Sequence, residues 1–298
     1  MQAISVPLQN RSYPIWIENG LLAKLPELLK PMNQNQKWVI FSQNEIISLY
    51  GNNLRESLKY AGFQVELVVL PDGEKAKSLS ALEGIFSQLM EKGCDRSSTF
   101  LALGGGVVGD ATGFIAATFM RGVDYIQIPT TLLAMVDSSI GGKTGVNLPA
   151  GKNLVGVIWQ PKAVVIDPKL LESLPEREIS SAMGEVIKYG AILDRDIFDL
   201  ISSNLEDLLK LANPVLLTKV IGCCAKLKAD VVAEDEREGG KRRILNFGHT
   251  IGHALETNFG FDTLRHGEAI AYGMLAAGKL SIEDGRMKNE DFELLEEI

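Results

Sequence analysis

All three histidines of the chain lie within residues 249–266. His249 and His253 are four positions apart in a segment predicted as helix, so both imidazoles project from one face. Two imidazoles on one helix face commonly serve as ligands for a divalent metal. The alternative is a pair of buried histidines that only pack between helices. Spacing alone makes His249 and His253 the ligand pair, leaves the role of His266 open and requires a carboxylate to complete the site.

Glu185 is the candidate for that carboxylate. It lies in the segment Gly184-Glu185-Val186-Ile187-Lys188-Tyr189 of a helix predicted over residues 179–193. Lys188 follows on the same face, so an ordinary surface ion pair is the alternative. A metal site that lacks an oxygen ligand favours Glu185. Basic residues near such a metal, including Lys228 and Arg242, would bind an anionic substrate or remain solvated charges.

A glycine-rich segment in the first half of the chain suggests nucleotide binding. Residues 104–110 match G-x-G-x-x-G between a predicted strand and a predicted helix. In that context, the glycines let the backbone approach a pyrophosphate, and amides of the first helical turn bind it. The alternative is a tight turn without a ligand. A Rossmann fold places a carboxylate about 20 residues further on, at the end of the next strand. Asp124 instead precedes that strand, so we predict non-Rossmann binding with Glu74 near the ribose.

The segment from Pro129 to Asn153 is rich in glycine, hydroxyl groups and charge. It contains Asp137, Lys143 and Lys152. Such a composition predicts a polar ligand that carries phosphate or several hydroxyl groups. A solvated surface loop is the alternative, although the apolar residues embedded in the segment argue against it.

The elements that position these residues follow from hydrophobic periodicity. Predicted strands cover residues 38–41, 65–70, 99–103, 125–128 and 163–167, and predicted helices cover residues 45–61, 80–92 and 107–119. This strand-helix alternation predicts a mostly parallel sheet with helices on its faces. After residue 168 only helical patterns remain, including residues 214–233. We therefore predict an α/β domain over residues 1–168 and an all-α domain over residues 169–298. His266 is expected in a loop after the histidine helix.

Composition limits the remaining possibilities. The chain has 298 residues, of which 46% are hydrophobic and 23% charged, and its formal charge is −8. This charge argues against a general nucleic-acid surface. Three cysteines, two of them adjacent, do not form a disulfide framework. We find no signal peptide and no apolar run long enough to span a bilayer. The sequence thus predicts a cytoplasmic protein without nucleic-acid or membrane partners.

Together the motifs resemble the 3-dehydroquinate synthase family. The resemblance spans nearly the whole chain and rests on these segments: Pro71-Asp72-Gly73-Glu74, residues 104–110, Pro129-Thr130-Thr131, residues 137–147, residues 184–188, residues 245–253 and His266-Gly267-Glu268-Ala269. This combination is far more specific than any single motif. It implies a phosphorus–oxygen lyase of the shikimate pathway, which converts 3-deoxy-D-arabino-heptulosonate 7-phosphate to 3-dehydroquinate and phosphate and recycles NAD within each turnover.

The resemblance also implies roles for individual residues. Glu185, His249 and His266 would hold Zn²⁺ or Co²⁺, and His253 would act beside the metal in proton transfer, which replaces the ligand pair inferred from spacing. The residues implied to bind NAD are Asn44, Asp72, Glu74, Lys77, Gly105, Gly106, Val107, Asp110, Thr130, Thr131, Asp137, Lys143 and Lys152. The residues implied to bind the phosphorylated sugar acid are Asp137, Lys143, Lys152, Asn153, Lys188, Lys228, Arg242 and Asn246. Arg121, at the end of the helix after the glycine segment, would reach the substrate of a neighbouring subunit and so implies a homodimer.

The sequence departs from the family pattern at two places, and three alternative functions stay open. Family members usually extend further and carry an Asp-Lys-Lys segment that binds phosphate, whereas this sequence ends in what reads as an unfinished helix, residues 294–298. Ser42-Gln43-Asn44 also lacks the acidic residue that some relatives place at the ribose. The alternatives are a related sugar-phosphate cyclase, a metal-dependent polyol dehydrogenase that releases NADH, and a non-catalytic NAD-binding protein. The many basic residues favour a phosphorylated acid over a neutral polyol.

Overall fold

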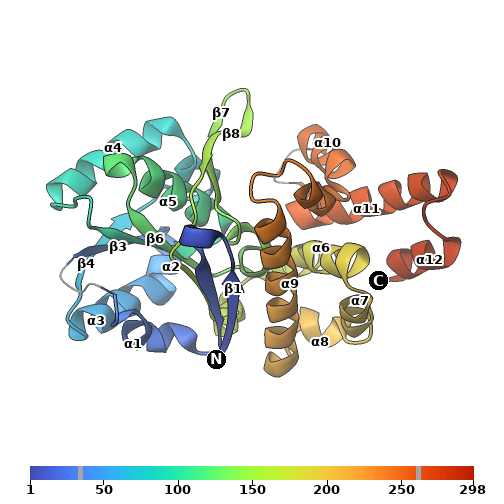
Figure 1. The fold of residues 1–298 in the computed structure, drawn as a ribbon, viewed down its shortest axis with the longest axis horizontal. Coiled ribbons are helices and arrows are strands. Elements are labelled where there is room, and N and C mark those ends of the chain that lie inside the picture. The colour runs from blue at the N-terminus through green and yellow to red at the C-terminus, as the bar shows by residue number, and fades with distance from the viewer. Residues whose placement is uncertain (33–35, 260–262) are drawn as a thin grey trace. The chain divides into compact units, whose positions relative to one another are not determined.

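The structure is a computed structural model that describes residues 1–32, 36–259 and 263–298. The chain forms two compact units, Met1–Leu170 and Leu171–Ile298, which we call unit 1 and unit 2. Unit 1 contains a mostly parallel sheet with helices, and the described part of unit 2 contains helices without strands (Figure 1). This arrangement confirms the predicted fold class.

The sheet of unit 1 has seven strands in the order β1-β2-β9-β6-β5-β3-β4 (Figure 1). Its strands are β1 (Gln2–Val6), β2 (Tyr13–Ile17), β3 (Lys37–Ser42), β4 (Gln64–Val69), β5 (Thr99–Gly104), β6 (Asp124–Pro129) and β9 (Ala163–Ile166). All neighbours are parallel except β1 and β2, which pair antiparallel at one edge. The chain moves from β3 outward to β4 and returns on the other side of β3 as β5. Ligands of open parallel sheets bind at the carboxyl ends of strands beside such a reversal.

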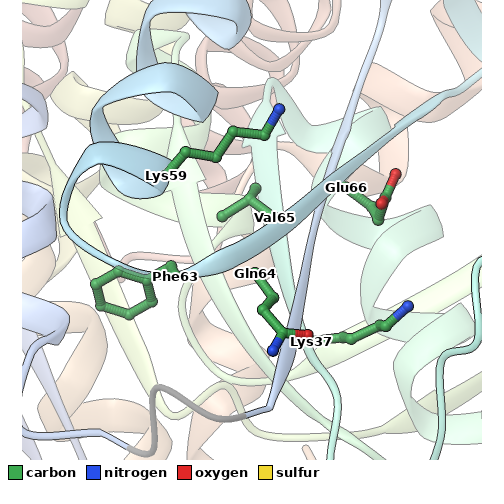
Figure 2. A pocket seen from close by; sticks show the side chains of 6 residues that line it. All are labelled: Lys37, Lys59, Phe63, Gln64, Val65 and Glu66. Carbon is green, nitrogen blue, oxygen red and sulfur yellow. The ribbon is translucent and has the colours of Figure 1, made fainter.

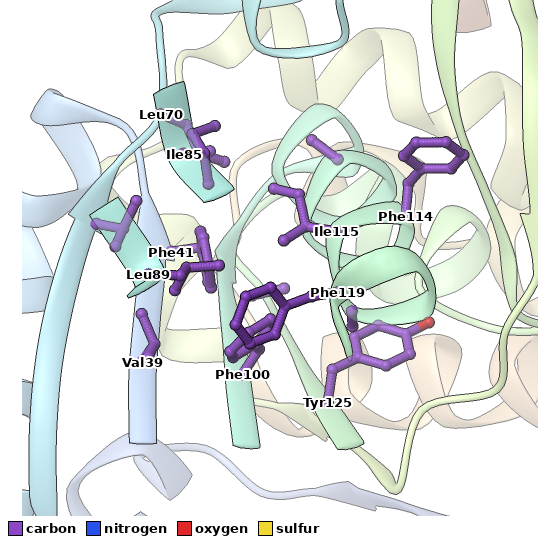
Figure 3. Packing of buried hydrophobic residues seen from close by; sticks show 14 of the residues in the cluster. Val39, Phe41, Leu70, Ile85, Leu89, Phe100, Phe114, Ile115, Phe119 and Tyr125 are labelled. Atoms are coloured by element: carbon purple, nitrogen blue, oxygen red, sulfur yellow. The ribbon is translucent and has the colours of Figure 1, made fainter. Parts of the chain in front are cut away.

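Two hydrophobic cores hold helices on the two faces of this sheet. The helices of unit 1 are α1 (Leu25–Leu29), α2 (Asn44–Ile46), α3 (Asn52–Tyr60), α4 (Leu79–Glu91) and α5 (Gly106–Thr118). Val39 and Phe41 of β3 pack with α4 and α5 on one face, as Figure 3 shows for the larger cluster. Trp38 and Ile40 pack with α1 and α3 on the other. Both faces of the central strands are buried, which explains their continuous apolar sequences.

Several elements of unit 1 differ from the sequence prediction. Strands β1 and β2 were not predicted, and neither was the hairpin of β7 (Lys143–Leu148) and β8 (Gly151–Ile158) within the glycine-rich segment. The helix predicted over residues 45–61 is interrupted by a wider turn at Ile47–Gly51. Helix α5 ends at Thr118, so Arg121 lies beyond it in a short turn with positive φ angles at Met120 and Arg121. The strand character of such segments depends on their pairing partners, so their own sequences give little local signal for a strand.

Unit 2 is a helical bundle in which two helix pairs meet closely. Its helices are α6 (Glu176–Leu193), α7 (Arg195–Ser202), α8 (Leu205–Leu209), α9 (Pro214–Glu234), α10 (His249–Phe259), α11 (His266–Glu283) and α12 (Asn289–Glu297). A Cβ placed on Gly267 would lie 1.7 Å from the backbone oxygen of Ser181, and one on Gly184 would lie 2.3 Å from the oxygen of Gly267. Glycine at these positions therefore lets α6 and α11 touch through their backbones.

Helix α10 meets α11 in the same way. A Cβ on Gly273 would lie 2.0 Å from the backbone oxygen of Gly248, which itself has φ +79°. Glycine tolerates this left-handed backbone and leaves room for the neighbouring helix. Across the described residues, no helix of either unit is long and apolar enough to cross a membrane.

Candidate metal centre and nucleotide site

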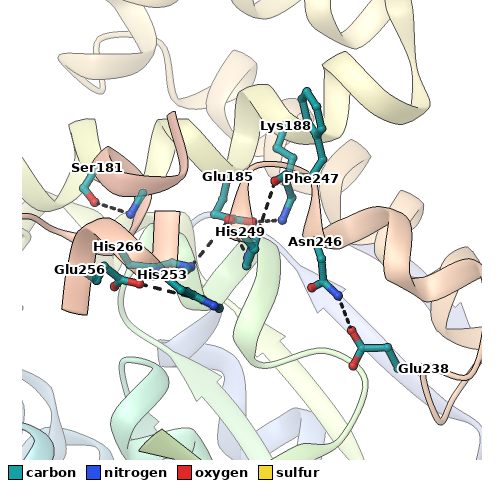
Figure 4. Close-up of polar contacts among 11 residues, drawn as sticks. Ser181, Glu185, Lys188, Glu238, Asn246, Phe247, His249, His253, Glu256 and His266 are labelled. Carbon is teal, nitrogen blue, oxygen red and sulfur yellow. Dashed lines mark hydrogen bonds and ion pairs between the residues drawn. The ribbon is translucent and has the colours of Figure 1, made fainter. Parts of the chain in front are cut away.

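Glu185 lies on α6 in the interior of unit 2. Glu185 and Lys188 are each about 1% exposed, and the Lys188 ammonium donates a short hydrogen bond to Glu185 Oε2 (Figure 4). The pair is therefore not the surface ion pair that sequence left as an alternative. The second carboxylate oxygen, Oε1, is buried and has no hydrogen-bond partner among the described residues. A buried carboxylate oxygen without a partner is costly, and a bound cation would remove that cost.

Two imidazoles face this oxygen. His249 Nε2 lies 3.6 Å and His266 Nε2 lies 3.8 Å from Glu185 Oε1. The ligating atoms of these three residues all lie within 4.8 Å of one another. Two imidazole nitrogens and one carboxylate oxygen form a donor set that suits a divalent transition metal such as zinc and leaves room for a further ligand. The geometry and chemistry of these residues thus fit the metal that the sequence implied.

The other ring nitrogen of each imidazole has its own partner. His249 Nδ1 lies 3.2 Å from the backbone oxygen of Phe247, and His266 Nδ1 lies 3.3 Å from Glu256 Oε1. An oxygen acceptor at Nδ1 favours the tautomer in which Nδ1 carries the proton and Nε2 is free to bind a metal. Burial lowers the pKa of His249, and the nearby Lys188 ammonium lowers it further. Both effects favour the neutral imidazole that a metal requires.

His253 occupies a different position from the one that spacing suggested. Its side chain is 60% exposed, and it shares a donor cluster with Glu256 and His266 instead of with Glu185. The ring centroids of His249 and His253 are 5.2 Å apart. The ligand pair inferred from spacing is therefore replaced in the structure by His249 and His266, because α11 brings His266 to the buried carboxylate. His266 begins α11 and does not lie in a loop as predicted.

The basic residues predicted to bind substrate in unit 2 are mostly buried. Lys228 is 5% exposed in α9, and Arg242 is 2% exposed in the short turn before α10. The Arg242 guanidinium donates to the backbone oxygen of Glu236, and the exposed Asn246 donates to Glu238 Oε1. Backbone N–H groups of Gly240 and Arg242 hold the pKa of Asp235 below its ordinary value. Buried cations in a chain of net charge −8 are consistent with an anionic ligand.

In unit 1, the predicted nucleotide-binding residues gather at the carboxyl edge of the sheet. Asn44 follows β3, and residues 105–107 follow β5, so the two segments flank the reversal of strand order. Asp72, Glu74 and Lys77 follow β4, and Thr130 and Thr131 follow β6. Asp124 begins β6 at the opposite edge, in agreement with binding that differs from a Rossmann fold.

The glycine segment is closely packed and lacks a side-chain cap. Gly105 caps α5 without a side chain, which leaves the first-turn amides available to an anion. None of the segment's glycines has a positive φ, so close packing and not an unusual backbone explains them. A Cβ on Gly106 would lie 2.9 Å from Ser138 Oγ. Ser138 Oγ and Thr130 Oγ1 are buried without a hydrogen-bond partner in the described part of the chain, which fits a polar cofactor at this edge.

Polar side chains from three segments connect beside the glycines. The buried Lys77 donates to Asp110 Oδ2 at 2.6 Å and also to Asn153 Oδ1. Asn147 donates to Glu74 Oε2 at 2.8 Å. The hairpin thus brings its polar residues to α5, because Gly113 of α5 leaves space for Thr144 of β7.

The other predicted residues of unit 1 lie close to this cluster or on neighbouring segments. Lys152 lies 3.8 Å from Glu74. Lys143 begins β7, and Asp137 lies in the turn Ala134–Ser138. Val107 lies in the first turn of α5. The structure therefore groups Glu74, Lys77, Asp110, Lys152 and Asn153 directly, and it places the other predicted residues of unit 1 on neighbouring segments.

Two cavities lie away from these residues. One of about 300 Å³ opens at the amino ends of β3 and β4 and is lined by Lys37, Lys59 and Phe63 among others (Figure 2). The other, of about 520 Å³, lies between the ends of α6, α7, α11 and α12 in unit 2. Neither cavity is lined by Glu185, His249 or His266.

Sequence reasoning missed two residues of these clusters. Glu256 follows His249 by seven positions and His253 by three, so helical spacing could have placed all three on one face. Asn147 joins the Glu74 cluster only because the β7–β8 hairpin positions it. Without that hairpin the sequence gives no local signal for its role.

Comparisons with known proteins agree along the whole chain. A family model described as 3-dehydroquinate synthase N-terminal matches residues 67–181, and one described as 3-dehydroquinate synthase C-terminal matches residues 182–298. The 3-dehydroquinate synthase of Prochlorococcus marinus (strain MIT 9312) is 49% identical over 97% of this chain and 81% of its own length. That of Thermodesulfovibrio yellowstonii (strain ATCC 51303 / DSM 11347 / YP87) is 48% identical over 100% of this chain and 83% of its own.

Solved structures of related synthases are also similar over nearly the whole chain. A 2-deoxy-scyllo-inosose synthase complexed with carbaglucose-6-phosphate, NAD+ and Co2+ has a TM-score of 0.90 at 28% identity and covers 99% of this chain and 79% of its own. A 2-epi-5-epi-valiolone synthase from Streptomyces hygroscopicus subsp. jinggangensis 5008, with NAD+ and Zn2+ bound, has a TM-score of 0.86 at 27% identity, covering 97% and 82%. Glycerol dehydrogenase from Schizosaccharomyces pombe, at 18% identity and a TM-score of 0.73 over 94% of this chain and 73% of its own, shares the fold alone.

Proposed function

This chain belongs to the 3-dehydroquinate synthase family, and we propose which of its residues bind the metal, NAD and the substrate in that family's reaction. The enzyme converts 3-deoxy-D-arabino-heptulosonate 7-phosphate to 3-dehydroquinate and phosphate, and it depends on NAD and a divalent metal. When bound, NAD supplies a reversible acceptor for hydride, and the metal supplies a Lewis acid for a substrate oxygen. These relatives do not favour the three alternatives, which are a related sugar-phosphate cyclase, a metal-dependent polyol dehydrogenase and a non-catalytic NAD-binding protein.

We assign the metal to Glu185, His249 and His266 of unit 2. The observation that carries this assignment is the buried Glu185 Oε1, which has no hydrogen-bond partner in the described part of the chain and faces both imidazoles at 3.6 and 3.8 Å. Lys188 donates a hydrogen bond to the other carboxylate oxygen, Oε2, and so fixes the orientation of the Glu185 carboxylate. His253, exposed beside this cluster, carries a proton to or from the substrate.

We assign NAD to the carboxyl edge of the sheet in unit 1. The amides at the start of α5 take the pyrophosphate, and the residues after β3, β4 and β6 surround the rest of the cofactor. Asp137, Lys143, Lys152 and Asn153 of unit 1 contact polar groups of the substrate. In unit 2, Lys188, Lys228, Arg242 and Asn246 neutralise its carboxylate and phosphate and orient its hydroxyls.

The recycling of NAD provides the main test of this function. With 3-deoxy-D-arabino-heptulosonate 7-phosphate in large excess over NAD, phosphate should appear in many-fold excess over NAD while the absorbance of NADH stays flat. Protein treated with a chelator should release no phosphate until Zn²⁺ or Co²⁺ is restored. NADH that accumulates in step with product would identify a dehydrogenase, and the absence of phosphate from metal-loaded protein would contradict the lyase.

We further propose a cytoplasmic homodimer in which Arg121 serves the partner's site. The family likeness supports the shared site, and Arg121 is exposed on a turn where it has φ +66°. The cysteines, all free thiols, suit a reducing compartment. Mixing an Arg121→Ala chain with a Glu185→Ala chain should restore activity, because one site of each heterodimer keeps both an intact metal cluster and the partner's arginine. With subunit exchange verified, no recovery would contradict sharing.

A further inference from the structure

Glu256 is a buried carboxylate on the same face of α10 as two of the histidines. It is 6% exposed, and it follows His249 by two helical turns and His253 by one (Figure 4). Its Oε1 lies 3.3 Å from His266 Nδ1, and its Oε2 lies 3.9 Å from His253 Nε2. Glu256 thus touches one proposed metal ligand and faces the proposed proton carrier.

The two ligand imidazoles are oriented by different means. His249 Nδ1 contacts a backbone oxygen, that of Phe247, which a substitution leaves in place. His266 Nδ1 contacts a side chain, that of Glu256. An imidazole that is free to choose its tautomer or rotate presents Nε2 to a metal only part of the time. The orientation of the His266 ring therefore depends on a replaceable side chain.

We propose that Glu256 is a positioning residue for the metal site. It accepts the Nδ1 proton of His266, keeps Nε2 of that ring directed at Glu185, and links the ring to His253 through its second oxygen. This inference rests on the proposed metal assignment to Glu185, His249 and His266. It adds a carboxylate that acts through a ligand without itself binding the metal.

Glu268 is a second carboxylate close to His266 in sequence, but its contacts differ from those of Glu256. Glu268 lies two residues after His266, yet it accepts two hydrogen bonds from Arg177 and one from the backbone of Arg265. Its partners among the described residues are thus Arg177 and Arg265, and it ties α11 to α6. Burying Glu256 against His266 and His253 is costly unless those contacts contribute to the site.

The test measures metal affinity directly, by competition with a chelator for Zn²⁺. Glu256→Ala should bind Zn²⁺ about 10- to 100-fold more weakly than the parent, the usual loss for such an acceptor. Glu256→Gln keeps an acceptor oxygen without the charge and should lose less. Glu283→Gln changes an exposed carboxylate near the end of α11 and should bind Zn²⁺ as the parent does. The Co²⁺-loaded Glu256→Ala protein should show altered visible absorption bands, while Glu283→Gln should match the parent.

A purely structural role would give a different result. It would lower the thermal stability of the metal-free protein without changing Zn²⁺ affinity in the folded state, and that outcome would overturn the inference. If Glu256→Ala does not fold, the conservative Glu256→Gln decides with the same measurements. A second equivalent of Zn²⁺ that is lost in the Glu256 variants would make His253, Glu256 and His266 a separate metal site and would also overturn it.

Failure of the metal assignment itself is distinguishable. Glu185→Ala and His249→Ala should abolish tight Zn²⁺ binding. If both bind Zn²⁺ as the parent does, the assignment fails. If both lose it while the Glu256 variants keep the parent's affinity, only the positioning role fails.

Discussion

At the scale of single residues, the buried Glu185–Lys188 ion pair connects protein stability with the proposed metal site. Both side chains are about 1% exposed, so each charge relies on the other in the metal-free protein. Removing one partner of a buried ion pair leaves an uncompensated charge, which costs more than the pair itself contributes. The pair therefore makes a stability measurement informative about the proposed metal site.

We predict that Glu185→Ala lowers the free energy of unfolding of metal-free protein by about 3–5 kcal/mol, because Lys188 stays buried without its partner. Urea denaturation of chelator-treated protein measures this loss. Asp230→Ala removes an exposed ion pair with Lys226 on α9 and should cost less than about 1 kcal/mol. Equal losses in the two variants would mean that the Glu185 pair is solvated in solution.

The individual residues were partly predictable. Spacing within α10 predicts the pair His249 and His253, and the need for an oxygen ligand points to Glu185. His266 as a ligand came from the resemblance. The pair that the structure brings to Glu185 depends on α11 returning to α6, a contact between residues 86 positions apart in sequence. Local periodicity carries no information about such a contact. Helical spacing places Glu256 on the histidine face of α10, but its contact with His266 depends on the packing of α10 with α11.

At the scale of elements, glycines determine how closely the ligand-bearing helices approach. A Cβ on Gly267 would lie 1.7 Å from a backbone oxygen of α6, which cannot move aside like a side chain. Gly84 of α4 offers the opposite case, because nothing lies within 4 Å of the Cβ it would carry. The same substitution should therefore have opposite effects at the two positions.

We predict that Gly267→Ala destabilises the protein by about 1–3 kcal/mol or more and weakens Zn²⁺ binding, because α11 must move away from α6. Gly84→Ala should instead stabilise by up to about 1 kcal/mol through helix propensity alone. Urea denaturation and chelator competition measure both effects. Unchanged Zn²⁺ affinity in a Gly267→Ala protein would show that the site tolerates separation of the helices.

An ion pair between the same two helices predicts a dependence on pH. Arg177 of α6 holds the pKa of Glu268 of α11 below its ordinary value of 4.5. The stability that this shift contributes is fully present above the ordinary value and is lost as pH falls through the lower, folded-state pKa. As pH falls, Glu268 is protonated first in the unfolded chain. The free energy of unfolding therefore falls between the unfolded-state pKa and the lower folded-state pKa of Glu268.

We predict that Arg177→Met flattens the fall in unfolding free energy between about pH 6 and about pH 3, because the largest cause of the lowered folded-state pKa of Glu268 is then removed. Urea denaturation at several pH values shows the slope. Adding Glu268→Gln to Arg177→Met should change the slope little. A parent and an Arg177→Met variant with the same slope would contradict the role of this pair.

The elements themselves were the most predictable part of the fold. Strands β3, β4, β5, β6 and β9 and helices α4, α5 and α9 lie close to their predicted positions, since each is a long apolar or periodic segment. Strands β1, β2, β7 and β8 were missed. Pro14 lies within β2, and glycines occur in β7 and β8, so the strand character of these segments depends on their pairing partners.

At the scale of the whole molecule, the proposed NAD and metal sites belong to units with separate cores. The NAD residues all lie before Leu170, and the metal residues all lie after Leu171. We predict that Lys77→Met weakens NAD binding about tenfold or more, through loss of charged hydrogen bonds, and changes Zn²⁺ affinity less than about twofold. Calorimetric titration of each ligand, without substrate, measures both.

The reciprocal substitution provides the control for that prediction. Glu185→Ala should remove Zn²⁺ and leave NAD affinity as in the parent. If either substitution weakens both ligands, the two sites are coupled before substrate binds, and the assignment of one site to each unit would be insufficient.

The backbone contact between α6 and α11 also affects the entropy of metal capture. Side-chain contacts can slide and change rotamer, whereas the oxygen of Ser181 lies directly against Gly267 with no side chain between them. Glu185 and His266, which adjoin this contact, are consequently held near their binding positions before a metal arrives. We expect capture to order few additional groups, and we expect release of the metal to require a local opening of the two helices.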